Sequence, residues 1–177
     1  MGIEIEKKFT IKELPNDLNT FPHHIIEQGY LNVSPAVRVR REDDNYYMTY
    51  KGSGPAKDGG IGKIEYNMSL DAESYANLVK KCDGNIIKKT RYLLPLNEGA
   101  FDSEFLSANP SIGQAITNGD IKIELDVFDA PFSGRHLAEV EFPNEESASA
   151  YHAASWFLKD VTGDYHYSNS YMSTESL

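Results

Sequence analysis

The chain has 177 residues, of which 40% are hydrophobic and 25% are charged. These proportions are typical of a globular protein with a buried core, and they exclude a disordered or a transmembrane chain, while the length suits one domain over residues 1–177. The formal net charge of −10 argues against general nucleic-acid binding, which needs Lys and Arg at many phosphates, but it leaves one phosphorylated ligand open because a ligand responds to local charges.

Short segments with strand-like alternation recur along the chain, each bounded by Pro, Gly, Asn or Asp. They cover residues 3–9, 36–42, 45–51, 61–70, 86–94, 121–128 and 137–142. Asp43 to Asn45 has the length of a hairpin turn, and 52–60 has the composition of a loop. Helices are predicted after Asp71, over 145–159, and as a short element near Glu13 or Pro15, while 97–120 is weakly patterned and fits a short helix or an inserted flap. The order predicts an α+β fold, mainly antiparallel β.

Charged residues share one face of each predicted strand, because residues two apart in a strand point the same way. The signs are sorted by strand: the like-charged neighbours are Glu4 with Glu6, Arg38 with Arg40, Lys89 with Arg91, Glu124 with Asp126, and Glu139 with Glu141. For any single strand, the solvated face of an ordinary sheet is the simpler explanation. Taken together, the pairs repel unless ions or ligands of opposite sign lie among them. The acidic pairs therefore indicate metal ions, and the basic pairs, with Lys8, Lys51 and Lys63, indicate phosphates.

A closed barrel would let these charged faces meet. Curling the sheet with its polar face inward gives a charged lumen, and about eight strands leave room for one small ligand. The apolar outer face must then be covered by helices or by a partner subunit. We therefore predict a closed, eight-stranded, tunnel-like β-barrel with helices packed outside, and we leave open a homodimer formed through the outer face.

The opening residues Glu4 to Lys8 resemble the ExExK motif of the CYTH superfamily, also called triphosphate tunnel metalloenzymes. The match continues in the family's order through 28–31, 38–40, 49–52, 63–66, 89–92, 124–128, 139–142 and 161–164. A lone ExExK occurs by chance in many strands, whereas the ordered series is specific. Small chains that open with EIEKKF most resemble the inorganic triphosphatase branch. The resemblance implies a tunnel-shaped barrel that binds triphosphate through basic residues and divalent metal through carboxylates.

Individual roles follow from this resemblance together with the charge pattern. Carboxylate oxygens suit Mg²⁺ or Mn²⁺, with Glu4, Glu6, Glu139 and Glu141 expected at a principal metal and Glu65 and Asp126 at a second. The residues expected to bind the phosphates are Lys8, Arg38, Arg40, Lys51, Lys63, Lys89 and Arg91. The predicted catalytic set is Glu4, Glu6, Lys8, Glu65 and Lys89. Asn67 stands where the family often carries a second carboxylate, which lowers the negative charge at the second metal.

The predicted function is metal-dependent hydrolysis of inorganic triphosphate to pyrophosphate and phosphate, by in-line attack of water without a covalent nucleophile. One alternative is a class IV-type adenylyl cyclase or a nucleoside or thiamine triphosphatase, which requires a pocket for the organic group. Another is a non-catalytic binder of polyphosphate or nucleotide, which Asn67 keeps open. Cys82 is the one cysteine, so an internal disulfide and a cysteine-based zinc site are excluded. With no N-terminal apolar run, a cytoplasmic protein without membrane contact is expected.

Overall fold

β-branched and aromatic residues in alternation with polar ones favour strands through most of this chain. A computed structural model describes the backbone of residues 2–52 and 63–177 and the side chains of 5–52 and 65–177, and in these residues nine strands form one antiparallel sheet. They are β1 (Gly2–Ile11), β2 (His23–Val33), β3 (Ala36–Glu42), β4 (Asn45–Gly52), β5 (Lys63–Leu70), β6 (Asp83–Leu94), β7 (Ile123–Phe128), β8 (His136–Phe142) and β9 (Phe157–Asp160). The predicted α+β, mainly antiparallel fold is confirmed.

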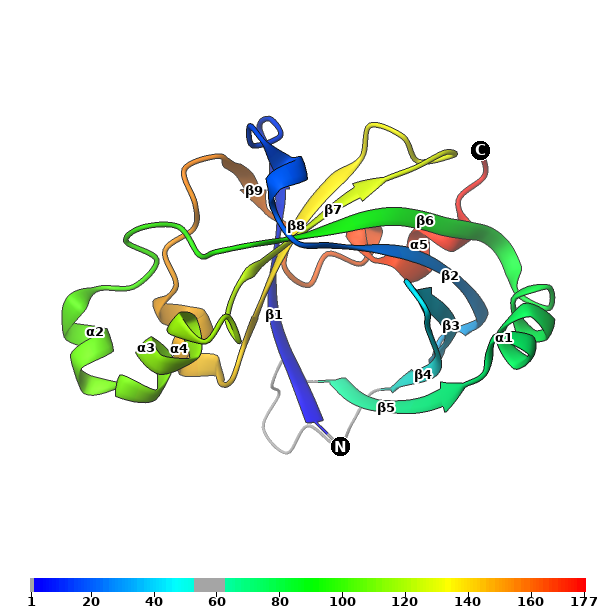
Figure 1. Ribbon diagram of the computed structural model, residues 1–177, viewed down its shortest axis with the longest axis horizontal. Helices are drawn as coiled ribbons and strands as arrows, with labels where there is room; N and C mark the ends of the chain where they lie inside the picture. The colour runs from blue at the N-terminus through cyan, green and yellow to red at the C-terminus, as the bar shows by residue number, and fades with distance from the viewer. Residues whose placement is uncertain (1, 53–62) are drawn as a thin grey trace.

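The sheet curves strongly (Figure 1). Its strand order is β5-β4-β3-β2-β6-β7-β8-β1-β9, and β5 at one end of this order also pairs with β1 through the register Ile3 to Ile64. The strand β9 extends the order beyond β1. Because of the curvature, side chains on the inner face of β3 and β4 point toward those of β1 and β8 rather than away from them.

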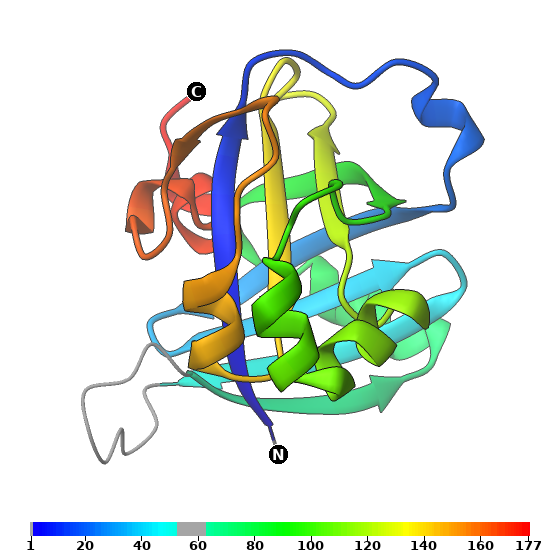
Figure 2. The same ribbon diagram turned by 90° about the vertical axis from the view of Figure 1, so that its left-hand side faces the viewer.

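The helices lie outside the curved sheet or at its end. In α1 (Ala72–Val79) the carboxylate of Asp71 caps the first turn by accepting a hydrogen bond from the backbone N–H of Ser74, 2.6 Å away, and the helix packs against β2, β3 and β4. Figure 2 shows α2 (Ser103–Ala108), α3 (Pro110–Thr117) and α4 (Glu145–Ala150) in front of β1, β7 and β8. The C-terminal α5 (Asn169–Thr174) contacts β2 and β6. In the part of the chain that the structure describes, no helix is long and apolar enough to cross a membrane.

The main hydrophobic core lies between the outer face of β1, β7 and β8 and the helices α2 to α4. Its buried residues include Phe101 and Ile112 from the helical segment and Leu125 and Val140 from the strands. A smaller core joins β2, β6 and α5 through Tyr30 and Met172, among others. The segment 97–120, expected to be a short helix or a flap, therefore forms two short helices that cover the apolar outer face.

The predicted helix over 145–159 is wrong beyond its first half. Helix α4 ends at Ala150, since Tyr151 adopts an extended backbone (φ −69°, ψ 127°). Residues 157–160 instead form β9, and the ring of Phe157 stacks on Phe9 of β1 with centroids 4.5 Å apart. The packing of these two aromatic rings thus outweighs the local helix propensity of this segment.

Strand β2 was not predicted, although it lies at the centre of the sheet between β3 and β6. The polar residues His23, His24, Glu27 and Gln28 do not alternate with the apolar residues in the way that identifies a strand. The hairpin predicted at Asp43 to Asn45 is present, with Asp43 in the left-handed region (φ 52°). A short 3₁₀ helix, η1 (Leu18–Thr20), begins after the helix expected near Pro15. The loop predicted over 52–60 lies almost wholly outside the described residues.

Candidate active site

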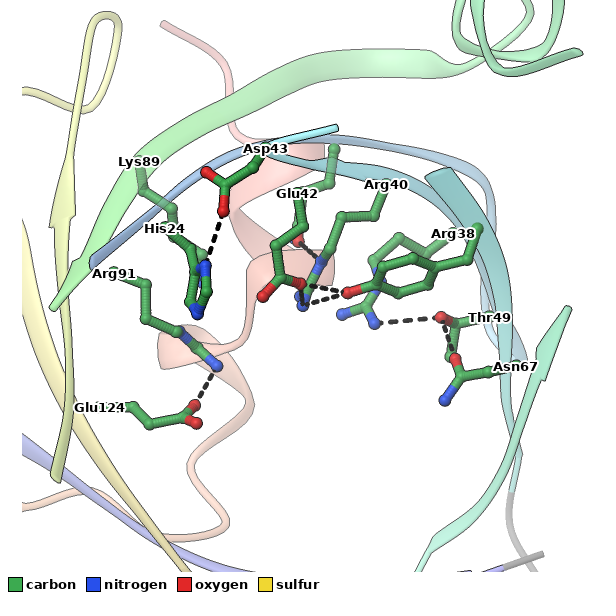
Figure 3. Close-up of polar contacts among 12 residues, drawn as sticks. His24, Arg38, Arg40, Glu42, Asp43, Thr49, Asn67, Lys89, Arg91 and Glu124 are labelled. Atoms are coloured by element: carbon green, nitrogen blue, oxygen red, sulfur yellow. Dashed lines mark hydrogen bonds and ion pairs between the residues drawn. The ribbon is translucent and has the colours of Figure 1, made fainter. Parts of the chain in front are cut away.

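A cavity of about 1100 Å³ lies on the inner face of the sheet, and its lining includes most of the charged residues singled out from the sequence. Strands β1, β3, β4, β5, β6 and β8 contribute to it, and so does the C-terminal segment around Asp164 and Ser168. Figure 3 shows the side chains of Arg38, Arg40 and Arg91 reaching from different strands toward the same space. The predicted site residues that line the cavity are Glu6, Lys8, Arg38, Arg40, Lys51, Glu65, Arg91, Glu139 and Glu141.

Two predicted site residues are placed differently, and the side chains of two others are not described. Lys89 and Asp126 are fully buried and do not belong to the cavity lining, because they pair with each other behind it. The side chains of Glu4 and Lys63 lie outside those that the structure describes. Their backbones pair across β1 and β5, with Glu4 opposite Lys63.

A buried ion-pair network joins β1, β6, β7 and β8. The ammonium of Lys8 lies 2.9 Å from a carboxylate oxygen of Glu139, and Arg91 Nη2 lies 2.6 Å from the other oxygen of Glu139. Arg91 also donates to Asp126, with Nε 2.7 Å from Oδ1, and to Glu124. Each cation of this network is therefore already neutralised by carboxylates, and the sorted charges of these strands largely compensate one another.

The protonation states of the acids and of Lys89 in this network follow from the pairing of opposite charges. Burial alone would raise the pKa of Glu139, but Lys8 and Arg91 hold the pKa well below its ordinary value. Burial lowers the pKa of Lys89 to about 8 despite the neighbouring Asp126. For Asp126, Arg91 and Lys89 outweigh burial and lower the pKa. The two acids are thus carboxylates at neutral pH, and the network is held by charge-assisted hydrogen bonds.

The cations of β3 have a different environment. Arg38 and Arg40 are each 8% exposed and stand two residues apart on the cavity face. Arg38 donates from Nη2 to the Thr49 hydroxyl at 3.1 Å, and among the described residues its buried Nε has no hydrogen-bond partner. Burial and the neighbouring Arg40 lower the pKa of Arg38, yet a guanidinium remains charged. This side of the cavity therefore offers positive charge that a bound anion would satisfy.

Arg40 is held in place by its neighbours in the sheet. Its Nε donates to Gln28 Oε1 at 3.0 Å, and Gln28 is fully buried. Its Nη1 donates to the hydroxyl of Tyr47 at 3.2 Å, and that hydroxyl donates to Glu42 at 2.5 Å. The carboxylate of Glu42 lies 3.7 Å from Arg40 Nη1. Arg40 thus presents its charge to the cavity in one fixed orientation.

A chain of polar side chains crosses from β3 to β5 beside these arginines. The Thr49 hydroxyl accepts from Arg38 and donates to Asn67 Oδ1 at 2.6 Å (Figure 3). The Asn67 amide nitrogen donates to Glu65 Oε1 at 2.8 Å, and Glu65 Oε2 lies 2.9 Å from the ammonium of Lys51. Burial alone would raise the pKa of Glu65, but Lys51 and Asn67 lower it, so this acid is a carboxylate.

Two glutamates lie side by side on adjacent strands of the opposite cavity wall. Glu6 of β1 and Glu141 of β8 are direct Cα partners, and both line the cavity. Mg²⁺ in enzymes is commonly bound by one or two carboxylates together with substrate phosphates and water. No group of three or more Asp, Glu, His or Cys residues arranged for a metal ion is found in the described residues. The donor set of Glu6 and Glu141 therefore fits a divalent cation that takes its remaining ligands from a phosphate substrate and water.

Comparison with known proteins decides the family. The model of the CYTH domain matches residues 2–149. The chain belongs to the CYTH domain family. The inorganic triphosphatase of Nitrosomonas europaea is 31% identical over 170 residues, covering 94% of this chain and 93% of the relative. The inorganic triphosphatase of Acetivibrio thermocellus is 28% identical over 179 residues, covering 96% of this chain and 92% of the relative. A crystal structure of an inorganic triphosphatase covers 99% of this chain and 97% of its own, with 27% identity and a TM-score of 0.65.

The CYTH resemblance read from the ordered motifs is thereby confirmed. Most of the charged residues in those motifs meet at one cavity, as strand parity predicted. Strand parity did not distinguish two classes of cation in this CYTH domain. Cations such as Arg91 belong to the ion-pair network, whereas cations such as Arg38 face the cavity with little negative charge beside them. Tyr47 was not predicted as a site residue, although it shares the inner face of β4 with Thr49 and Lys51 and could have been found by that spacing.

Proposed function

We propose that this protein hydrolyses inorganic triphosphate to pyrophosphate and phosphate in the cavity on the inner face of its sheet. One observation carries the proposal: Arg38 and Arg40 are buried side by side at the cavity, and Arg38 keeps a buried donor without a protein partner in the described residues. Two adjacent buried guanidinium groups repel each other unless an anion lies between them. A chain of phosphates supplies several negative oxygens in a form that arginine binds by paired hydrogen bonds.

The relatives support the choice of substrate. Two proteins that align over more than nine-tenths of this chain are named inorganic triphosphatases, and a crystal structure with that name has the same fold over nearly the whole chain. The activity is therefore proposed for this chain as well. The opposite placement of cations on β3 and carboxylates on β1 and β8 agrees with a ligand that carries both phosphate and metal.

We also propose that eight of the strands work as a closed tunnel around the substrate. The support is the pairing of β5 with β1, which brings the two ends of the order β5 to β1 into contact. In this arrangement the inner faces of all eight strands surround one ligand. Helices α2 to α4 lie on the outside of these strands (Figure 2) and cover apolar side chains that would otherwise contact water, and α1 lies outside β2, β3 and β4 (Figure 1).

For the metal, we propose that Glu6 and Glu141 hold Mg²⁺ or Mn²⁺, with Glu4 and Glu139 beside them and Glu65 at a second position. Such an ion polarises a phosphoryl oxygen and offsets the negative charge of the substrate when it is bound. Asp126 serves the buried network in this fold, since it is fully buried and paired with Lys89 and Arg91. We therefore assign Asp126 to the orientation of Arg91 and not to a metal ion.

In the proposed reaction, Arg38, Arg40 and Lys8 hold the phosphate oxygens in line for attack. A water molecule oriented by a carboxylate of the cavity forms a bond to the terminal phosphorus and transfers a proton to that carboxylate. The bond from that phosphorus to the bridging oxygen breaks, so that pyrophosphate and phosphate leave. Lys51 lies 2.9 Å from Glu65 and can hold that carboxylate toward the reacting phosphate. Because the cations are fixed by the sheet before substrate arrives, little reorganisation is needed in the transition state.

The proposal is tested by incubating the protein with Mg²⁺ or Mn²⁺ and inorganic triphosphate, ATP or thiamine triphosphate, and by measuring phosphate, pyrophosphate and cyclic AMP. We expect phosphate and pyrophosphate from inorganic triphosphate, a loss of turnover with a metal chelator, and a loss of turnover in Glu6→Gln. Full metal-dependent turnover by Glu6→Gln would contradict the role given to this residue. Tight binding of triphosphate without any product would favour a non-catalytic binder.

A second candidate substrate has a specific observation in its favour. The cavity of about 1100 Å³ is as large as pockets that enclose drug-sized ligands, and Tyr30, Tyr46, Tyr47, Tyr50 and Tyr165 contribute to its lining. Tyrosine rings stack on planar organic groups. If ATP is turned over with a higher kcat/KM than inorganic triphosphate, the organic triphosphate is the preferred substrate.

A further inference from the structure

The side chain of Asn67 occupies the middle of the polar chain that runs from Arg38 to Lys51. It accepts a hydrogen bond from the Thr49 hydroxyl at 2.6 Å and donates one to Glu65 Oε1 at 2.8 Å. Thr49 is fully buried between Arg38 and Asn67, whereas Asn67 itself is exposed at the cavity. One side chain thus connects the environment of a cavity arginine with that of the Lys51–Glu65 ion pair.

An amide is the side chain that satisfies both neighbours at once. A hydroxyl has one proton to donate, and the proton of Thr49 goes to Asn67, so the lone pairs of the hydroxyl face Arg38. Glu65 is an acceptor on the other side and needs a donor, which the amide NH₂ group provides. A carboxylate at position 67 would place an acceptor oxygen against Glu65 Oε1, where the structure now has a donor at 2.8 Å.

The charge of position 67 also matters for Arg38. With a neutral amide, the acceptor of Arg38 is the neutral Thr49 hydroxyl, and the positive charge of Arg38 stays available to the cavity. A carboxylate one hydroxyl away would compensate part of this charge and would repel a phosphate at the same place. The neutral relay therefore orients Arg38 without neutralising it.

We propose that Asn67 is a positioning residue for triphosphate binding. Its amide holds Glu65 against Lys51 and the Thr49 hydroxyl against Arg38. Because the amide is neutral, the positive charge of Arg38 stays available to the substrate. This inference rests on the proposed function, since it concerns the affinity of the same cavity for the same anion. It makes the affinity for inorganic triphosphate more sensitive to a negative charge added at position 67 than to one added at a cavity residue outside the relay.

The test measures the dissociation constant of inorganic triphosphate by titration calorimetry in a metal chelator, for the wild type, Asn67→Asp and Asn45→Asp. Asn45 also lines the cavity, so Asn45→Asp makes the same chemical change outside the relay. We expect binding about tenfold weaker in Asn67→Asp, the effect of a change of about 1.4 kcal/mol, and within about threefold of wild type in Asn45→Asp. In turnover assays KM should rise by about the same factor in Asn67→Asp while kcat changes less, because the lost interaction serves substrate binding.

A further variant, Thr49→Val, removes the relay hydroxyl without adding charge. It should weaken triphosphate binding severalfold, and it decides the question if Asn67→Asp does not give a cooperative thermal unfolding transition. Equal weakening by Asn67→Asp and Asn45→Asp, or unchanged binding in Asn67→Asp or Thr49→Val, would overturn the role of Asn67 while leaving the proposed function intact. Absence of triphosphate binding by the wild type both in the chelator and with Mg²⁺ or Mn²⁺ would overturn both.

Discussion

Replacing Arg38 by Gln should reduce activity strongly and leave the fold almost unchanged. Arg38 is 8% exposed, it hydrogen-bonds the neutral Thr49 hydroxyl at 3.1 Å, and its Nε is unpaired within the described residues. A net hydrogen bond to a charged group contributes about 1.5–3 kcal/mol, so loss of the guanidinium from a phosphate should cost about 3 kcal/mol, or roughly a hundredfold in kcat/KM. Removing a buried charge that has no ion-pair partner among the described residues should change the free energy of unfolding by less than about 1 kcal/mol.

The assay pairs steady-state hydrolysis of inorganic triphosphate with urea unfolding of the same preparations. Arg41→Gln is the matched control, because Arg41 lies on the same strand but is exposed and bonds the backbone carbonyl of Asp43. It should retain wild-type activity and stability. If Arg38→Gln keeps kcat/KM within about threefold of wild type but loses 2 kcal/mol or more of stability, Arg38 is structural and the reasoning from its unpaired donor is refuted.

Three other predictions follow from the ion-pair network and the core. Arg91→Gln should cost about 3–5 kcal/mol in urea unfolding, since it leaves Asp126 without its main partner and Glu139 without one of its two ion-pair partners, and a loss below 1 kcal/mol would contradict a buried network. Because the folded pKa of Glu139 lies below the unfolded value of about 4.3, its stabilisation is complete above that pH and is lost as the pH falls through the folded pKa. Stability measured from pH 6 to pH 3 should therefore fall, and less steeply in Glu139→Gln than in wild type. Phe157→Ala should cost about 3–5 kcal/mol through the cavity left beside Phe9, whereas the exposed Leu158→Ala should cost less than 1 kcal/mol.

Much of the fold follows from period-two patterning. The bounds of β3 match the prediction, and those of β4 and β7 differ from it by one or two residues, because each strand has one apolar and one charged face between clear turn residues. The strand β2 and the end of the helix at Ala150 do not follow from local sequence. In the first case the polar residue Gln28 is fully buried in a central strand, and in the second the distant Phe9 decides the conformation of Phe157.

Parity predicted which charged residues share a face of each strand, but not which of them pair with one another. Lys89 and Arg91 have the same spacing as Arg38 and Arg40, yet the former meet Asp126 and the latter do not. The reason is the strand order, which places β6 beside the acidic β7 and β3 beside β4, whose inner face carries no acidic residue. Sequence spacing alone carries no information on this adjacency. The relay through Asn67 likewise depends on Thr49 and Asn67 being cross-strand partners.

Phosphorus NMR of the purified protein with inorganic triphosphate and Mg²⁺ or Mn²⁺ tests the central claim most directly. The account predicts that triphosphate disappears with formation of phosphate and pyrophosphate in equal amounts, that the reaction stops in a metal chelator, and that Arg38→Gln slows it about a hundredfold at low substrate concentration. Triphosphate that stays intact while bound to the protein would contradict the account.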